Sequence, residues 1–122
     1  IAALDGAQGL FVLLEAFDKD DVRIAADLAR ARRGRDEQVL MGINSRDLQT
    51  LAIDLGRFAQ LREALPPEWP AVAESGVITA EDAAVVARLG YRLALVGTAL
   101  MQREDPAQAV RELLAAGRGA AA

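Results

Sequence analysis

Two short motifs that pair a glycine with a hydroxyl residue are the strongest candidates for chemistry in this chain. Ser75-Gly76 follows the apolar run Ala71–Ala73, and Gly97-Thr98 follows the apolar run Leu93–Val96. Glycine lets a ligand approach the backbone closely, and the N–H groups that open a helix bind anions. Because each motif stands just before a helical pattern, the pair predicts a phosphate site built from two successive strand–helix units.

Four further polar residues stand at or near the ends of apolar runs: Glu15, Asn44, Arg46 and Glu74. A partly desolvated carboxylate at Glu15 suits general acid–base catalysis, and the Asn44 amide suits orienting a substrate because it donates and accepts hydrogen bonds. Arg46 is a candidate for gripping phosphate with its forked guanidinium. We expect Glu74 to point away from a phosphate, which its charge would repel, into supporting hydrogen bonds.

Three of these residues also have purely structural interpretations, which the sequence leaves open. Glu15 could cap a loop at the end of its strand. Asn44 could occupy a turn in the left-handed conformation that asparagine tolerates. Arg46 could form an ion pair with Asp47 or Asp54.

The elements that must position these residues alternate between strand and helix about four times. We expect buried strands at Leu10–Leu14, Val39–Ile43, Ala71–Ala73 and Leu93–Val96. Helices are expected over Asp18–Arg33, Leu55–Leu65, Thr79–Leu89, Ala99–Met101 and Pro106–Ala116. This order predicts parallel strands whose carboxyl ends share one edge, in either a doubly wound sheet or a barrel segment.

Composition narrows the class of protein. The chain has 122 residues, a net charge of −4 and a hydrophobic fraction of 52%, which indicates one globular domain and argues against nucleic acid as the main partner. The arginines of the run Arg30–Arg35 are expected to form a solvated helix end. No apolar run reaches the roughly 20 residues of a membrane span. The chain has no cysteine, which excludes thiolate metal sites, and no histidine, the commonest general base and metal ligand. We expect neither a metal nor a cofactor.

The two ends of the chain give two further expectations. The chain opens on Ile1-Ala2-Ala3-Leu4 without an initiator methionine, and Lys19 is its single lysine, so we expect a piece of a longer protein. Residues 117–122, which are rich in alanine and glycine, are expected to form a disordered tail.

Three blocks of sequence together resemble one enzyme family. They are GINSRDL at Gly42–Leu48, AESG at Ala73–Gly76 and LVGTALM at Leu95–Met101, with Leu14-Glu15 upstream at a fitting distance. These blocks resemble indole-3-glycerol phosphate synthase, and the resemblance covers the chain from about Leu10 to Leu114. The GINSRDL block is far more specific than a generic loop between a strand and a helix.

The resemblance implies an α/β fold, the (βα)8 TIM barrel, of which residues 1–122 supply the C-terminal half, strands five to eight. It also implies a cytoplasmic carboxy-lyase of tryptophan biosynthesis. Such an enzyme closes the indole ring of 1-(2-carboxyphenylamino)-1-deoxyribulose 5-phosphate with loss of CO₂ and water. The implied partner is therefore a phosphorylated small molecule.

The resemblance also assigns roles to individual residues. Glu15 matches the catalytic glutamate of strand five, and Asn44 matches the substrate-orienting asparagine of strand six. The implied substrate- and phosphate-binding positions are Arg46, Glu74, Ser75, Gly76, Gly97 and Thr98. The catalytic lysines of the family and a further glutamate lie on strands one and three, and Lys19 cannot replace them. We therefore expect the chain to depend on a missing N-terminal half-barrel and to have negligible activity alone.

Two other interpretations stay open. One is another phosphate-binding barrel enzyme, such as a phosphoribosyl isomerase or the tryptophan synthase α subunit, although the GINSRDL block disfavours it. The other is a non-catalytic half-barrel that binds a phosphorylated metabolite or pairs with another half-barrel.

Overall fold

Strand and helix alternate along the chain in the computed structural model, which describes residues 11–33 and 38–121. The elements are β1 (Phe11–Ala16), α2 (Lys19–Ala31), β2 (Gln38–Asn44), α3 (Gly56–Arg62), β3 (Ala71–Glu74), α4 (Ala80–Arg88), β4 (Leu93–Leu95), α5 (Thr98–Met101) and α6 (Pro106–Ala121). The predicted alternation is confirmed for the described residues, while Leu10 lies outside them.

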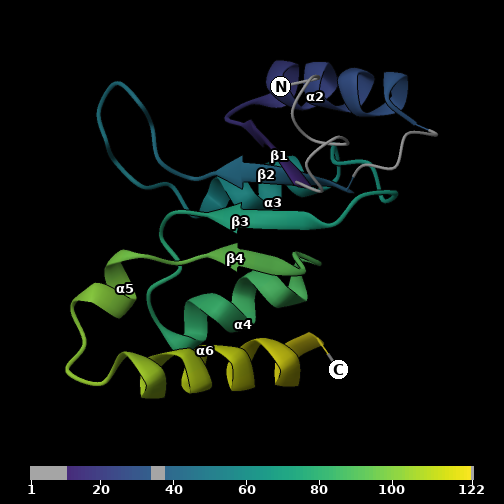
Figure 1. Cartoon of the computed structure of the whole chain (residues 1–122). Helices are drawn as coiled ribbons and strands as arrows, with labels where there is room; N and C mark the ends of the chain where they lie inside the picture. Colours follow the sequence, from purple (N-terminus) through teal and green to yellow (C-terminus); the bar gives the residue numbers. More distant parts are fainter. Residues whose placement is uncertain (1–10, 34–37, 122) are drawn as a thin grey trace.

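The four strands form one parallel sheet in the order β1-β2-β3-β4. All four arrows point the same way in Figure 1, so the carboxyl ends of the strands share one edge. A doubly wound sheet reverses its strand order at a switch point, and this sheet does not. The topology therefore favours the barrel segment over the doubly wound alternative.

Two helix starts follow from local sequence. Asp18 is the N-cap of α2, and its side chain accepts a hydrogen bond from the Asp21 N–H. Thr79 and Asp82 form a reciprocal capping box at the start of α4. These caps satisfy N–H groups that the helices themselves leave free.

The core lies between the sheet and the helices that follow each strand. Its largest fully buried side chains include Phe58 of α3 with Met41 and Ile43 of β2. Tyr91, just before β4, packs edge-to-face on Phe58 with 5.3 Å between ring centroids. The Tyr91 hydroxyl donates to the Phe58 carbonyl oxygen at 2.8 Å, and burial raises the pKa of Tyr91 to about 12. This contact ties α3 to the segment that leads into the last strand.

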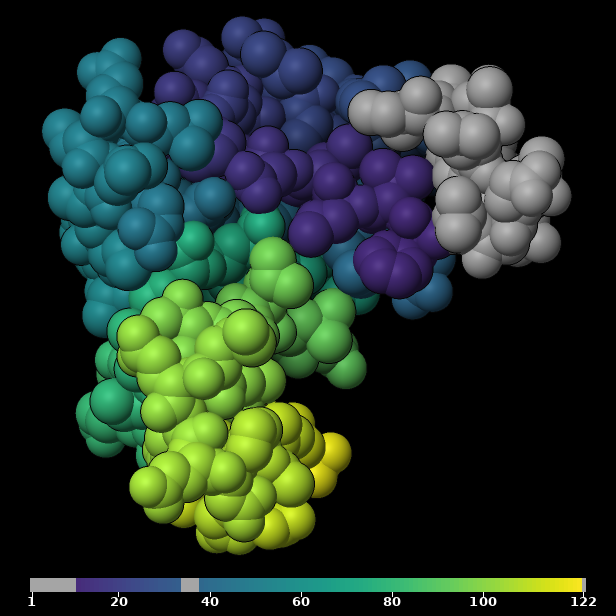
Figure 2. Space-filling model, turned by 60° about the vertical axis from the view of Figure 1, so that its left-hand side comes forward, coloured from purple at the N-terminus to yellow at the C-terminus, as the bar shows by residue number. Residues whose placement is uncertain are grey.

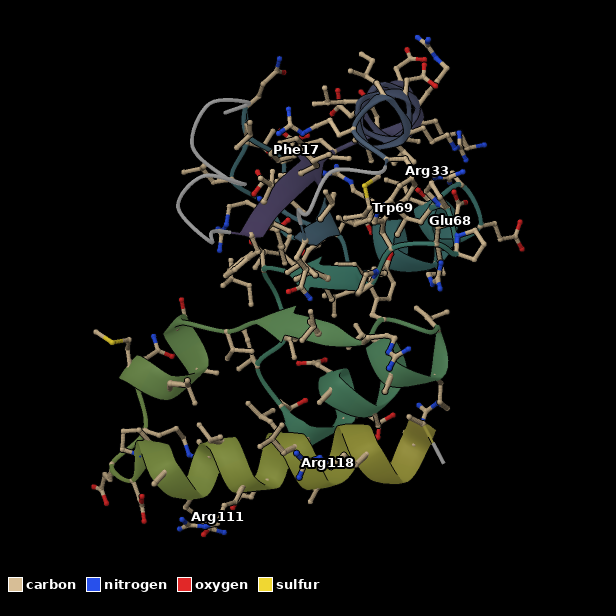
Figure 3. All side chains as sticks on the ribbon, turned by 45° about the vertical axis from the view of Figure 1, so that its right-hand side comes forward. Phe17, Arg33, Glu68, Trp69, Arg111 and Arg118 are labelled. Carbon is tan, nitrogen blue, oxygen red and sulfur yellow. The ribbon has the colours of Figure 1, made fainter. Side chains whose placement is uncertain are left out.

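The arginine-rich end of α2 is paired with the loop before β3. Arg33 and Arg30 both form ion pairs with Glu68, and the Arg33 guanidinium lies 5.7 Å from the centroid of the Trp69 ring. Figure 3 shows Arg33, Glu68 and Trp69 gathered at this end of the helix. The position at a helix carboxyl end is electrostatically favourable for arginine.

The tail is where the structure differs most from the sequence expectation. Helix α6 continues through Ala121, whereas a disordered tail is expected from Gly117 onward. Alanine is the best helix former, and α6 packs along α4, where Leu113 and Ala116 meet the core (Figure 1). Packing against α4 thus accompanies a helix that continues five residues beyond the expected end at Ala116.

The Tyr91 hydroxyl offers a direct test of the core. We expect Tyr91→Phe to lower the free energy of unfolding by about 1 kcal/mol, because the buried hydrogen bond from the hydroxyl to the Phe58 carbonyl is lost while the ring packing is kept. Urea denaturation of both proteins measures the difference. An unchanged midpoint and slope would contradict this role of the hydroxyl.

Candidate functional site

Glu15, Asn44 and Glu74 meet at the carboxyl edge of the sheet. Asn44 pairs in register with Glu74 on β3, and Glu15 pairs with Gly42 on β2. The Asn44 Nδ2 donates to Glu15 Oε1 at 3.3 Å, while the Asn44 Oδ1 accepts from the Arg46 N–H at 2.9 Å. Both ends of the Asn44 amide are thereby oriented.

The structure supports neither of the structural alternatives for Asn44 and Glu15. Asn44 is the last residue of β2 and is not among the residues with positive φ, so the left-handed turn interpretation is wrong. Glu15 lies inside β1 and accepts a hydrogen bond from the neighbouring strand rather than from a loop. Its side chain is exposed, so the expected desolvation does not fall on Glu15.

Desolvation falls on Glu74 instead, which is only 2% exposed. A Cβ atom added to Gly42 would lie 2.1 Å from Glu74 Oε2, so the carboxyl group lies directly over the Gly42 backbone. Burial, followed by the hydrogen bond and the charge of Glu15, raises the pKa of Glu74 to about 8. Burial beside Glu15 therefore favours the protonated form of Glu74.

The proton on Glu74 changes the chemistry of this edge. A neutral carboxylic acid can donate a hydrogen bond, which a carboxylate cannot. Two neighbouring carboxyl groups also resist being ionised together. Glu74 Oε2 has no hydrogen-bond partner among the described residues, so a buried polar atom remains open beside Glu15. The edge therefore places a buried carboxyl group with a raised pKa beside a second, exposed carboxyl group.

The first glycine–hydroxyl motif forms a tight left-handed turn after β3. Ser75 has φ +66° and Gly76 has φ +77°, a region that side chains rarely adopt. A Cβ atom added to Gly76 would lie 2.6 Å from Leu55 Cδ2 and 2.7 Å from Ile53 Cγ2. Glycine is thus required at position 76 by both conformation and packing.

The second motif lies beside the first. β3 and β4 pair with Glu74 opposite Leu95, so Ser75-Gly76 and Gly97-Thr98 leave neighbouring strand ends. The Gly97 carbonyl oxygen accepts from the N–H groups of Leu100 and Met101 at 3.0 Å, which starts the short helix α5. The space around the Gly97 Cα is open, unlike that around Gly76.

Arg46 binds its own loop. Its Nη1 donates to the Leu51 carbonyl oxygen at 3.0 Å, and its backbone bridges to Ile53. No ion pair joins Arg46 to Asp47 or Asp54 within the described residues, so that alternative is wrong. Hydrogen bonds from the Thr50 and Gln49 N–H groups hold the pKa of Asp47 below its usual range.

Two contributors to this edge were missed by sequence reasoning. Gly42 makes room for the buried carboxyl of Glu74, and Arg57 Nη1 donates to the carbonyl oxygens of Asn44 and Arg46 at 3.1 and 3.5 Å. Of these two residues, only Gly42 could have been found from the sequence, because a glycine inside an apolar run often marks a close approach of another group. The reach of Arg57 from α3 back to β2 depends on the tertiary fold.

Two negative findings concern the described residues only. Within 11–33 and 38–121, no group of three or more acidic side chains is placed to hold a metal ion. None of the helices in that part of the chain has the length and apolar character needed to cross a membrane.

Comparison with known proteins identifies relatives of this chain. Residues 2–113 match the family model described as indole-3-glycerol phosphate synthase. The curated indole-3-glycerol phosphate synthase of Exiguobacterium is 42% identical over 105 residues, covering 86% of this chain. Those of Koribacter versatilis and Azospirillum brasilense are both 37% identical and cover 87% and 89% of it. The chain spans 38% of the length of each of these three relatives.

A solved structure supports the fold. A chain in the crystal structure of the Amycolatopsis orientalis BexX/CysO complex superposes with a TM-score of 0.60 at 19% sequence identity. The match covers 94% of this chain and 57% of that one, so the same arrangement of strands and helices occurs within a longer chain.

The raised pKa of Glu74 predicts a stability that depends on pH. Between the ordinary value of 4.5 and about 8 the folded chain binds more protons than the unfolded chain, so stability falls as pH rises through this window. Glu74→Gln imitates the neutral acid, and we expect its free energy of unfolding to fall less between pH 5 and pH 8.5.

Urea denaturation at the two pH values measures this effect. Glu81→Gln removes an exposed carboxylate and serves as the matched control, which should keep the wild-type pH dependence. Parallel pH profiles for wild type and Glu74→Gln would show that Glu74 is ionised throughout.

Proposed function

Because the chain belongs to the indole-3-glycerol phosphate synthase family, we propose that it is part of an enzyme that closes the indole ring of 1-(2-carboxyphenylamino)-1-deoxyribulose 5-phosphate, releasing CO₂ and water. The fold of this family is the (βα)8 barrel, and a parallel four-stranded sheet with alternating helices fits half of one. The carrying observation is that Glu15, Asn44 and Glu74 converge beside Ser75-Gly76 at a single edge.

In this proposal some residues of the edge take part in the reaction and others hold the phosphate of the substrate. Glu15 exchanges protons with the substrate, and Asn44, oriented by its two hydrogen bonds, positions the reacting groups. Glu74 remains protonated and supports Glu15 from within the sheet. The substrate phosphate is held by Ser75, Gly76, Gly97 and Thr98, with Arg46 at the side of the site.

We also propose that residues 1–122 form strands five to eight of one barrel domain and need the N-terminal half to complete it. Both edge strands, β1 in purple and β4 in green, reach the surface in Figure 2. Phe11 of β1 is 63% exposed, and Leu93 and Leu95 of β4 are 45% and 59% exposed. Such apolar edges invite strand pairing.

A groove beside β4 is a second surface that the N-terminal half could cover. Its volume is about 950 Å³, and apolar side chains of β4, α4 and α6 line it, among them Val86, Leu95 and Leu114. A parallel strand added to β4 would cover this groove and pair with the open edge of the sheet. The missing half would also supply the catalytic lysines that the family resemblance places outside this chain.

Reassembly of the enzyme tests the proposal. We expect negligible ring closure by the chain alone and measurable turnover after co-expression with the part of the Exiguobacterium relative that lies N-terminal to the aligned region. Formation of the indole ring is followed by fluorescence. Substantial turnover by the chain alone would overturn the assignment of essential groups to the other half, and an inactive but correctly assembled complex would overturn the proposed reaction.

The role of Glu15 is testable in the same reassembled enzyme. Removing a general acid–base group typically costs 10²–10⁴-fold in rate, so we expect Glu15→Gln to lower kcat by roughly that factor. Glu104→Gln, which changes an exposed glutamate outside the site, should retain kcat. Equal kcat values for the two variants would show that Glu15 does not take part in the reaction.

A further inference from the structure

Ser45 is a fully buried polar residue between the two loops that form the candidate site, with 0% exposure. Its N–H donates to the Glu74 carbonyl oxygen at 3.0 Å, and its own carbonyl oxygen accepts from the Asp54 N–H at 2.9 Å. Its hydroxyl donates to the Ser75 carbonyl oxygen at 3.0 Å. Two of these hydrogen bonds join Ser45 to the end of β3 and the turn after it, and the third holds Ser45 within the loop after β2.

The turn that receives the hydroxyl bond is conformationally demanding. Ser75 and Gly76 are consecutive residues with positive φ, and an ordinary side chain at Ser75 makes this conformation costly. Such a conformation persists only where the surroundings hold it. Ile53 and Leu55 pack against Gly76, and the Ser45 Oγ would lie 3.2 Å from a Cβ atom added there.

The direction of one peptide unit follows from the Ser45 hydrogen bond. The Ser75 carbonyl and the Gly76 N–H belong to the same planar trans peptide, so they point in opposite directions. Holding the carbonyl oxygen against the buried Ser45 hydroxyl turns the Gly76 N–H away from the interior. The hydrogen bonds between described residues include none from the Gly76 N–H, so this donor has no partner among them.

We propose that Ser45 is a positioning residue for anion binding: its hydroxyl holds the Ser75 carbonyl oxygen and thereby presents the Gly76 N–H to a phosphate group. This inference rests on the proposed role of Ser75-Gly76 as a phosphate anchor and names a residue that acts on it from the neighbouring strand. Ser45 touches no ligand itself. Its effect is on the geometry of the turn.

The test combines a conformational readout with a binding readout in the full chain. Ser45→Ala removes the hydroxyl, and Ser45→Cys keeps a similar shape with a much weaker donor. Thr50→Ala is the matched control, because it removes an exposed hydroxyl of the same loop that accepts from the Ala52 N–H and does not contact Ser75. The Ser75 Cα and Cβ chemical shifts report the left-handed turn, and titration with inorganic phosphate reports binding at the Gly76 and Gly97 amides.

We expect Ser45→Ala and Ser45→Cys to move the Ser75 shifts away from left-handed values and to weaken phosphate binding roughly tenfold. The loss should appear at the Gly76 amide more than at the Gly97 amide, and Thr50→Ala should behave as wild type. Unchanged Ser75 shifts in a folded variant would overturn the role of Ser45. Absence of any phosphate response in the wild-type chain would instead overturn the proposed anchor, while the Ser75 shifts would still decide the positioning role.

Discussion

Parallel pairing of neighbouring strands is the constraint on which the rest of this structure depends. Each strand pairs with the next one along the chain, so every carboxyl end falls on the same edge of the sheet. Polar residues that are far apart in sequence, such as Glu15, Asn44 and Glu74, come within reach only because of this register. The helices that follow each strand also begin at this edge, which brings the two glycine–hydroxyl motifs beside the same residues.

The burial of one carboxyl group gives this edge its chemical character. Gly42 lacks a side chain at the point where Glu74 crosses β2, and the resulting desolvation is the largest cause of the raised pKa of Glu74. Glu15 lies on β1, which pairs with the other edge of β2, and its side chain stays exposed. Its hydrogen bond and charge raise the pKa of Glu74 by less than burial does. The two glutamates therefore differ in solvation, because Glu74 lies over a glycine inside the sheet and Glu15 lies at its surface.

The sheet is also incomplete as a barrel. β4 exposes apolar residues on an open edge, and α6 packs on α4 in a way that leaves an apolar groove beside β4. The chain spans 38% of the length of its first curated relatives, so most of their sequence has no counterpart here. The apolar edge and the proposed phosphate anchor fit a site whose remaining groups come from additional strands.

The sequence by itself determined the order of strands and helices, the caps at Asp18 and Thr79, and the family, because these depend on local periodicity, capping chemistry and contiguous motifs. It also placed Glu15, Asn44 and Glu74 at strand ends. Only the tertiary structure decided which carboxyl is desolvated, that Arg46 binds the Leu51 carbonyl, and that Ser45 and Arg57 support the site. These features arise from contacts between separate strands and loops, and no local pattern encodes the distance between residues that only folding brings together.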